Sequence, residues 1–245
     1  MAVSELSAAP AGQVEPAVLR ASGLYAGYGD ITVVRNAGLE VSAGEIVAIL
    51  GPNGAGKSTT LLTLAGVLPP HGGRIEWQGA EMTGPLHKRA AAGLGLVPEE
   101  RSVIFSMTVR DNLLLGAEST ESACAIFPEL RKLLDRRAGL LSGGEQQMLT
   151  LARALSREPT VLLADELSLG LGPMVVDRLF EAIQEAARTV GTGVMLVEQQ
   201  AKRALKVADR WYLMRRGEVV ASGEAEGALD EVQRLYLAEH DASVK

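Results

Sequence analysis

The chain has 245 residues, of which 47% are hydrophobic and 4% aromatic, and its formal net charge is -6 at pH 7. This length supports one substantial core with a subdomain, and the negative charge argues against nucleic acid as the main partner. No apolar run approaches the roughly 18 residues that a membrane-spanning helix needs. One cysteine excludes an internal disulfide, and three scattered histidines suggest no histidine metal cluster.

The N-terminal part is predicted to be a short extension followed by strands and a helix. Residues 1–16 are rich in Ala, Ser, Pro and Gly, so we expect a mobile extension without a secretory signal. Strand-like runs follow at residues 17–24, 31–41 and 45–50. The last run ends in a continuously apolar stretch, as in a strand covered on both faces. A helix is predicted over residues 57–67, because Pro69-Pro70 cannot continue it.

The rest of the chain alternates strands with helices. Strands are predicted at residues 73–78, 94–97, 161–164, 194–197, 210–214 and 218–221. Helices are predicted at residues 175–190 and 227–237. A turn at Arg216-Gly217 should join the last two strands into a hairpin, and residues 101–157 should be helical throughout, as a subdomain. This order implies an α/β fold with a parallel sheet and right-handed crossovers.

A phosphate-binding loop is predicted between a buried strand and a helix. Residues 51–58, Gly-Pro-Asn-Gly-Ala-Gly-Lys-Ser, fit the pattern G-x-x-x-x-G-K-[ST]. Glycines let backbone N–H groups turn toward phosphate oxygens, and the helix N-terminus adds partial positive charge. Lys57 would reach the β- and γ-phosphates, and Ser58 would ligate Mg²⁺. The alternative is a Gly-rich turn that binds nothing, but the strand and helix around it favour a site. The predicted nucleotide-binding residues are Gly51, Pro52, Asn53, Gly54, Ala55, Gly56, Lys57, Ser58 and Thr59.

A second acidic element follows the apolar strand at residues 161–164. The strand ends in Asp165, and a carboxylate at this place holds Mg²⁺ in P-loop enzymes. Glu166, one residue later, would point at the attacking water. An acidic strand-to-loop transition without function is the alternative, and the phosphate loop upstream argues against it. The predicted reaction is hydrolysis of a nucleoside triphosphate, with Lys57 and Glu166 as catalytic residues.

The most specific motif is Leu-Ser-Gly-Gly-Glu-Gln at residues 141–146. Ser142 can cap a helix, and Glu145 three residues later completes a capping box. The glycines allow close approach to a phosphate, and the free N–H groups of a helix N-terminus bind anions. The alternative is a capped helix that binds nothing. The position of the motif between the phosphate loop and Asp165 argues against it.

With these three motifs, residues 17–240 resemble the ATP-binding cassette (ABC) ATPases. The resemblance implies an α/β P-loop NTPase cassette over residues 17–245, with a mixed sheet, an antiparallel β flank from residues 17–48 and 73–78, and a helical subdomain. The implied reaction is hydrolysis of ATP to ADP and phosphate. It also implies a head-to-tail dimer in which the signature motif faces the ATP of the other subunit. The cofactors would be ATP and Mg²⁺. The signature residues expected to bind nucleotide are Ser142, Gly143, Gly144 and Gln146.

Three further positions take their expected roles from the resemblance. Tyr28 lies where the family's adenine-stacking aromatic residue lies, although a half-buried strand tyrosine would look the same. Glu99 matches the Q-loop position, with Glu where most members have Gln, and would contact nucleotide and Mg²⁺. Gln199 matches the H-loop position, with Gln where most have His, and would orient the γ-phosphate or the water as a third catalytic residue.

Several segments resemble one subgroup, the shorter ATPase of high-affinity branched-chain amino-acid importers. These segments are residues 27–31, 97–99, 112–116, 143–148, 168–171 and 197–199. In that subgroup Glu at the Q-loop position and Gln at the H-loop position are the usual residues, so Glu99 and Gln199 are not signs of a degenerate site. The resemblance implies transmembrane permease subunits, a second ABC ATPase in a homo- or heterodimer, an indirect substrate-binding protein, and a peripheral position on the cytoplasmic face of the membrane.

Two departures from the subgroup keep other functions open. Leu167 replaces a proline, which could loosen the catalytic loop, and the segment between Gly116 and Phe127 looks short, which affects permease docking. One alternative is an ABC ATPase for another cargo, such as urea, short amides or lipid. Another is a nontransport ABC protein, although those usually have two cassettes or a long coiled coil. A third is a nonhydrolysing nucleotide binder, suggested by Leu167 and Gln199.

Overall fold

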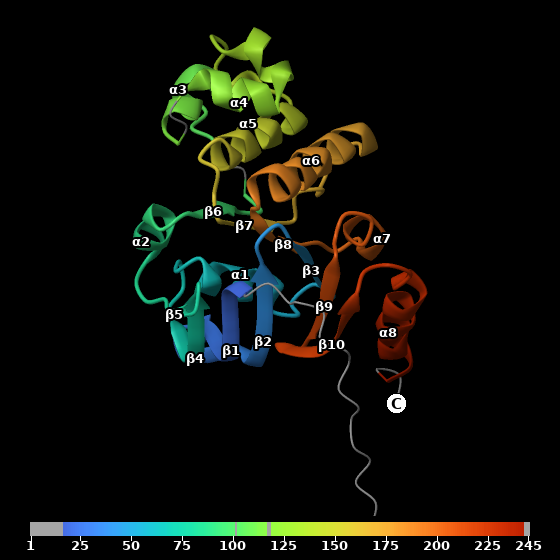
Figure 1. The fold of residues 1–245 in the computed structure, drawn as a ribbon. Helices are drawn as coiled ribbons and strands as arrows, with labels where there is room; N and C mark the ends of the chain where they lie inside the picture. Colours follow the sequence, from blue (N-terminus) through green and yellow to red (C-terminus); the bar gives the residue numbers. More distant parts are fainter. Residues whose placement is uncertain (1–16, 101, 117–118, 243–245) are drawn as a thin grey trace, which may run out of the picture.

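The computed structural model describes residues 17–100, 102–116 and 119–242 (Figure 1). An antiparallel sheet lies at the bottom of Figure 1, and the helices between residues 109 and 155 lie at the top. The predicted mobile extension, residues 1–16, lies outside the described residues. No described helix is long and apolar enough to cross a membrane.

The first sheet is antiparallel and has the strand order β2-β1-β4-β5. Its strands are β1 (Ala17–Tyr28), β2 (Ile31–Ser42), β4 (Pro70–Trp77) and β5 (Ala80–Glu81). It confirms the predicted antiparallel flank. The predicted limit at residue 48 was wrong, because residues 46–48 pair in parallel with strands of the second sheet.

The second sheet is mixed and has the order β10-β9-β3-β8-β7-β6. Its strands are β3 (Ile46–Leu50), β6 (Leu94–Val97), β7 (Val161–Asp165), β8 (Gly193–Val197), β9 (Arg210–Arg215) and β10 (Glu218–Glu224). Only β10 runs antiparallel to its neighbour. Every residue of β3, β7 and β8 is buried, which explains their continuous apolar sequences. The predicted hairpin is confirmed, because Arg216 and Gly217 both have positive φ, as a tight two-residue turn requires.

Five helices of the described chain lie outside the helical group at the top of Figure 1. They are α1 (Lys57–Leu64), α2 (Leu86–Ala91), α6 (Pro173–Glu185), α7 (Ala201–Ala204) and α8 (Leu229–Ala242). The helix predicted to reach residue 67 ends at Leu64, and Gly66 has the positive φ typical of a helix end. A π-helical turn, Ala186–Val190, follows α6. Helices α2 and α7 were not predicted, because such short segments show no periodicity.

The helices at the top of Figure 1 are shorter than predicted. They are α3 (Val109–Leu114), α4 (Thr120–Ile126) and α5 (Gly143–Leu155), with 3-10 turns at Pro128–Leu133 and Ala138–Leu140. Residues 101–157 are therefore not helical throughout. Among the described residues of this region, residues 102–107 contain no helix, and Thr108 forms an isolated bridge with Arg137.

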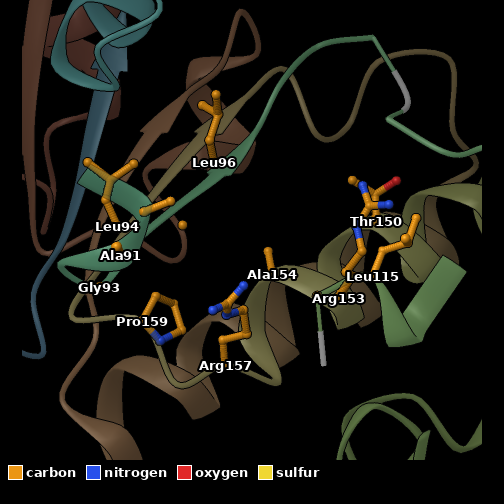
Figure 2. A pocket seen from close by; sticks show the side chains of 13 residues that line it. Ala91, Gly93, Leu94, Leu96, Leu115, Thr150, Arg153, Ala154, Arg157 and Pro159 are labelled. Atoms are coloured by element: carbon orange, nitrogen blue, oxygen red, sulfur yellow. The ribbon is translucent and has the colours of Figure 1, made fainter. Parts of the chain in front are cut away.

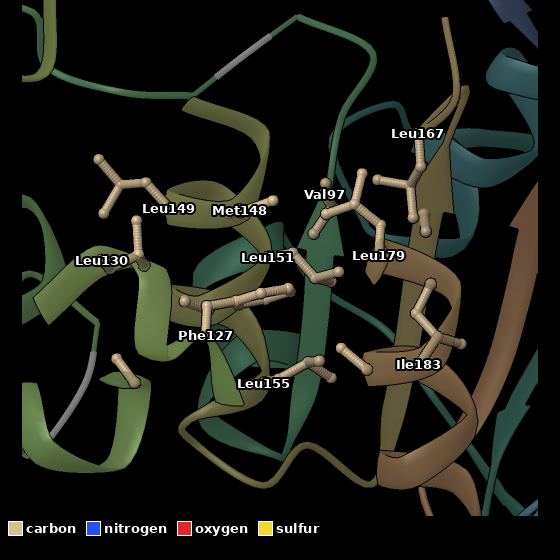
Figure 3. Packing of buried hydrophobic residues seen from close by; sticks show 14 of the residues in the cluster. Val97, Phe127, Leu130, Met148, Leu149, Leu151, Leu155, Leu167, Leu179 and Ile183 are labelled. Carbon is tan, nitrogen blue, oxygen red and sulfur yellow. The ribbon is translucent and has the colours of Figure 1, made fainter. Parts of the chain in front are cut away.

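A continuous apolar cluster joins this helical group to α6 and the second sheet. Figure 3 shows Phe127 and Leu151 on one side and Leu167, Leu179 and Ile183 on the other. Each fully buried side chain of this size contributes about 1.5–3 kcal/mol relative to exposure. Leu167, which replaces the family's proline, is only 1% exposed. Its packing therefore anchors the loop that the loss of proline was expected to loosen.

Candidate nucleotide site

The phosphate-loop residues curl between β3 and α1. Gly51 has a φ of 151°, and a Cβ placed on it would lie 2.3 Å from the Met214 carbonyl oxygen, so only glycine fits. The loop is attached to the β9–β10 hairpin by a hydrogen bond of 2.9 Å from the Gly217 N–H to the Ala55 carbonyl. The β9–β10 hairpin therefore contacts the loop through backbone atoms near Gly51 and at Ala55.

Lys57 is held inside this loop. Its side chain is only 5% exposed, and Nζ donates hydrogen bonds to the carbonyls of Gly51 at 2.9 Å and Pro52 at 3.2 Å. Burial lowers the pKa of Lys57, while the nearby carboxylates, chiefly that of Glu166, oppose this shift. The ammonium group thus lies at the centre of the loop, where it can exchange carbonyl oxygens for phosphate oxygens.

Asp165 has the environment of a cation ligand. It ends β7, is 3% exposed, and accepts a hydrogen bond from the Ser58 hydroxyl. Its Oδ1 is buried and has no hydrogen-bond partner. Burial raises the pKa of Asp165, and the charge of Glu99 adds to this effect. A buried carboxylate oxygen without a partner, beside a hydroxyl and a second carboxylate, fits a hard divalent cation such as Mg²⁺.

The described residues contain no group of three or more His, Cys, Asp or Glu that could hold a metal by themselves. An Mg²⁺ ion held by Ser58, Asp165 and Glu99 would take its remaining ligands from water or phosphate oxygens. This donor set matches an ion that arrives with nucleotide.

Glu166 is placed to act on water. It is 6% exposed, has a φ of 50°, and its N–H donates to the Val197 carbonyl at 2.9 Å. Its carboxylate accepts a hydrogen bond from the Gln199 side chain. Burial, followed by the negative charge of Glu198, raises the pKa of Glu166 to about 7, against the effect of Lys57. A buried carboxyl with a pKa near neutrality suits a general base.

One cavity of about 270 Å³ brings most of the predicted site together. Its lining residues are Val33, Asn53, Gly54, Ala55, Gly56, Lys57, Ser58, Thr59, Glu99, Glu166 and Gln199. The four segments that supply the predicted phosphate, Q-loop, catalytic and H-loop residues therefore meet at one place. Tyr28 lies outside this lining, at the end of β1, and is 51% exposed, so adenine stacking stays a prediction.

The signature motif forms the predicted helix start but lies outside the cavity. The capping box is confirmed: Ser142 Oγ accepts the Glu145 N–H at 3.3 Å, and Glu145 Oε2 accepts the Ser142 N–H at 2.7 Å. The Ser142 N–H also lowers the pKa of Glu145. None of Ser142, Gly143, Gly144 and Gln146 lines the cavity of Lys57.

Gln146 is engaged by the turn that precedes α5. Its side chain is buried, and its amide donates to the carbonyls of Ala138 at 3.2 Å and Leu141 at 3.3 Å. These bonds hold the turn before α5. The side-chain N–H groups are thus used within the chain, and contact of Gln146 with ATP stays a prediction.

Sequence reasoning missed a buried pair beside the site. Glu198 is fully buried, and its carboxylate accepts hydrogen bonds from both the N–H and the hydroxyl of Ser168. Both residues lie within segments that resemble the subgroup, residues 168–171 and 197–199, but the sequence predicted no role for either. A usable signal was present, because Glu198 follows an uninterrupted apolar strand, β8, much as Glu166 follows β7.

A second hollow of about 360 Å³ lies between β6 and α5. Figure 2 shows Leu94 and Leu96 on the β6 side and Arg153 and Arg157 on the α5 side. Leu115, at the end of α3, also lines it and is 52% exposed. This surface combines an apolar floor with cationic side chains.

The chain is similar to known proteins over most of its length. The ABC transporter family model matches residues 34–168. The chain is 42% identical over 222 residues to the high-affinity branched-chain amino acid transport ATP-binding protein BraG of Pseudomonas aeruginosa, covering 86% of this chain and 95% of the relative. It is 35% identical to the lipopolysaccharide export system ATP-binding protein LptB of Escherichia coli (strain K12), covering 91% and 98%.

Solved structures show the same fold. A nucleotide-free ATP-binding cassette from an ABC transporter has a TM-score of 0.79 at 26% identity, covering 89% of this chain and 96% of the other. A cassette in its ADP conformation has a TM-score of 0.78 at 26% identity, covering 91% and 99%. The chain therefore belongs to the ATP-binding proteins of ABC transporters. It is an ATPase, and its hydrolysis of ATP is coupled to transport.

Proposed function

We propose that this chain is the Mg²⁺-dependent ATPase subunit of an importer for branched-chain amino acids, bound peripherally to the cytoplasmic face of the membrane. The observation that carries the hydrolytic role is the meeting of Lys57, Glu166 and Gln199 in one cavity. The cargo is supported by the similarity to BraG and by a 35% identical relative from Archaeoglobus fulgidus, the probable branched-chain amino acid transport ATP-binding protein LivF, covering 87% of this chain and 94% of that relative.

In the proposed reaction the chain positions the phosphates and the water. The Lys57 ammonium exchanges its bonds to loop carbonyls for bonds to phosphate oxygens. Ser58 and Asp165, with Glu99, would hold Mg²⁺, which supplies charge neutralisation when bound. Glu166 accepts a proton from the attacking water, and the Gln199 amide orients the water or the γ-phosphate, because an amide cannot act as a base near neutral pH.

A second cassette would complete the site. The signature residues Ser142 and Gly144 lie outside the cavity of their own chain, as a head-to-tail dimer requires. Two large apolar side chains after Glu166 are exposed: Leu169, in the loop, is 52% exposed, and Met174, in the first turn of α6, is 86% exposed. Such side chains suit an interface that closes when ATP binds. The partner is a second ABC ATPase, in a homodimer or a heterodimer.

The hollow of Figure 2 is the proposed docking site of the transmembrane permease. Leu115, which is 52% exposed, offers apolar contact, and Arg153 and Arg157 favour an acidic residue in the docking segment. The proposed occupant is a cytoplasmic segment of the permease. A substrate-binding protein would act only indirectly, through the permease.

Lipopolysaccharide or another lipid is the second candidate cargo, supported by the similarity to LptB.

The deciding experiment is purification of the tagged chain from its own membranes in mild detergent, followed by mass spectrometry and reconstitution in proteoliposomes. We expect permease subunits, and ATP turnover stimulated by a binding protein loaded with leucine, isoleucine or valine. Stimulation by lipopolysaccharide alone would transfer the proposal to lipid export, and absence of ATP turnover would exclude a hydrolytic role.

A further inference from the structure

Glu198 is a buried carboxylate for which the proposed reaction has no use. It directly follows β8, and its side chain is 0% exposed. Its Oε1 accepts the Ser168 N–H at 3.0 Å, and its Oε2 accepts the Ser168 hydroxyl at 2.6 Å. Both carboxylate oxygens are therefore engaged by one residue of the loop that follows β7.

Burying the negative charge of Glu198 is energetically unfavourable. Burial raises the pKa of Glu198, and the two hydrogen bonds from Ser168 oppose this shift. In the part of the chain that the structure describes, no Lys, Arg or His forms an ion pair with Glu198. A buried carboxylate without a cation in contact is unfavourable unless its hydrogen bonds are strong. The short bond from the Ser168 hydroxyl meets that condition.

The held loop carries the proposed catalytic base. Ser168 lies two residues after Glu166, whose φ of 50° is uncommon for a residue with a side chain. The Glu166 N–H donates to the Val197 carbonyl at 2.9 Å, and the Leu169 N–H donates to the Glu166 carbonyl at 3.1 Å. The end of β8 thus binds this loop twice, through Val197 and through Glu198. A strained conformation persists only where the surroundings determine it in this way.

We infer that Glu198 is a positioning residue, which through Ser168 holds Glu166 in place for attack by water. The inference rests on the proposed function, in which Glu166 is the general base. Glu198 does not line the nucleotide cavity, so its role is to position another residue. Its loss should therefore reduce turnover and leave nucleotide binding intact.

The test compares Glu198→Ala, Glu198→Gln and wild type, each assembled with its partner subunits. For Glu198→Ala we expect kcat to fall on the order of 10- to 100-fold, because misplacing a catalytic group has effects of this size. The Kd for MgATP should change less than about twofold, because the substitution removes no group that contacts the bound nucleotide. Glu198→Gln can still accept one hydrogen bond from Ser168 and should keep kcat within about fivefold of wild type.

A matched pair covers the case in which Glu198→Ala fails to fold. Ser168→Ala removes only the hydroxyl bond and should lower kcat with the Kd unchanged. Thr192→Val removes a buried hydroxyl bond of 2.8 Å to the Pro159 carbonyl, next to the opposite end of β8, and should leave kcat unchanged. A kcat for Ser168→Ala equal to that of Thr192→Val would overturn the inference. Parallel losses of kcat and ATP affinity in Glu198→Ala would also overturn it, because they indicate general disruption.

Amide hydrogen exchange of the nucleotide-free protein separates this inference from the proposed function. Faster exchange in Glu198→Ala, confined to residues 166–171, is expected if Glu198 holds the loop. Unchanged exchange there would overturn the inference even if wild type hydrolyses ATP. Absence of turnover in wild type would instead refute the proposed function, and the exchange result would still show whether Glu198 holds the loop.

Discussion

Lys57 Nζ lies 3.8 Å from Glu166 Oε1, and both side chains are 5% exposed. The cation that should meet the phosphates and the carboxylate that should meet the water therefore share one buried space. Nucleotide would separate the pair, because the γ-phosphate has to lie between the ammonium group and the water that Glu166 activates. Without nucleotide, the Lys57 ammonium group and the Glu166 carboxylate compensate each other's buried charge.

Lys57→Ala should weaken ATP binding severely. Loss of a hydrogen bond to a charged group costs about 1.5–3 kcal/mol, which corresponds to roughly 10- to 150-fold in Kd. Titration with a fluorescent ATP analogue at limiting nucleotide measures the effect. Lys88→Ala, which changes an exposed lysine on α2, is the control and should bind as wild type. Near-wild-type affinity of Lys57→Ala would refute the phosphate-loop assignment.

The nucleotide-free protein should lose stability as the pH rises, in part through Glu166. The pKa of Glu166 is raised from 4.5 to about 7 in the folded protein, so the folded state binds this proton more readily than the unfolded state. Ionisation of Glu166 therefore opposes folding fully above about pH 7, and this penalty fades as the pH falls from about 7 to 4.5. Asp165 and Glu198 act in the same direction, because burial raises their pKa values too.

Glu166→Gln isolates this effect. Without nucleotide and Mg²⁺, its Tm should exceed that of wild type at pH 8, and the difference should shrink at pH 5. Glu181→Gln, at an exposed position of α6, is the control and should show no such pH-dependent gain. A gain for Glu166→Gln that is larger at pH 5 than at pH 8 would contradict the sign of the shift.

The local parts of the fold were predictable from sequence, and the long-range parts were not. The buried strands β3, β7 and β8 follow from uninterrupted apolar runs, and the Ser142 cap follows from a pattern within four residues. The assignment of residues 46–48 to the second sheet depends on pairing with β8 and β9, which local patterns do not specify.

The same division holds at the site. Lys57 and Asp165 are recognisable because each belongs to a motif with a known spacing. The contact between Ser168 and Glu198 joins residues 30 positions apart, and no spacing rule connects them. The structural role of Gln146 depends on two carbonyls of the preceding turn, whose positions only the folded chain defines. Nor did the sequence indicate that Leu167 belongs to the core.

Gly144→Asp should prevent ATP-dependent dimerisation if Gly144 faces the phosphate of the partner's ATP. A carboxylate there would repel the phosphate, while the chain's own phosphate loop remains intact. A Cβ on Gly144 would also lie 3.0 Å from Val175 Cγ1, so steric crowding contributes. Gly144→Ala is therefore the matched control, with the crowding but without the charge. Size-exclusion chromatography with ATP in a Glu166→Gln background should show dimers for Gly144→Ala and monomers for Gly144→Asp. Dimers in both would argue against the signature role.

Leu167→Ala should destabilise the chain by about 2–5 kcal/mol, as expected when a buried leucine is truncated. Leu167 is 1% exposed and belongs to the cluster that contains Leu179 and Ile183 (Figure 3). Leu167→Met conserves the volume and should cost less than about 1.5 kcal/mol. Urea denaturation measures both values. Equal stability of Leu167→Ala and wild type would show that packing does not anchor this loop.

Glu166 and Gln199 should contribute unequally to hydrolysis. Glu166→Gln should keep ATP binding and stop hydrolysis almost completely, because the amide cannot accept the proton from water. The nucleotide should then remain trapped in a closed dimer. Gln199→Ala should slow turnover less, because it removes hydrogen bonds but no charge.

Gln199→His restores the residue that is common in the family. It should retain activity and gain a pH dependence at about pH 6.5, where a free imidazole titrates. Single-turnover hydrolysis of the three variants, each with its assembled partners, provides the comparison. Faster hydrolysis by Glu166→Gln than by Gln199→Ala would mean that the base is another group. In that case the carboxylate beside Lys57 would serve only to hold the ammonium group until nucleotide arrives.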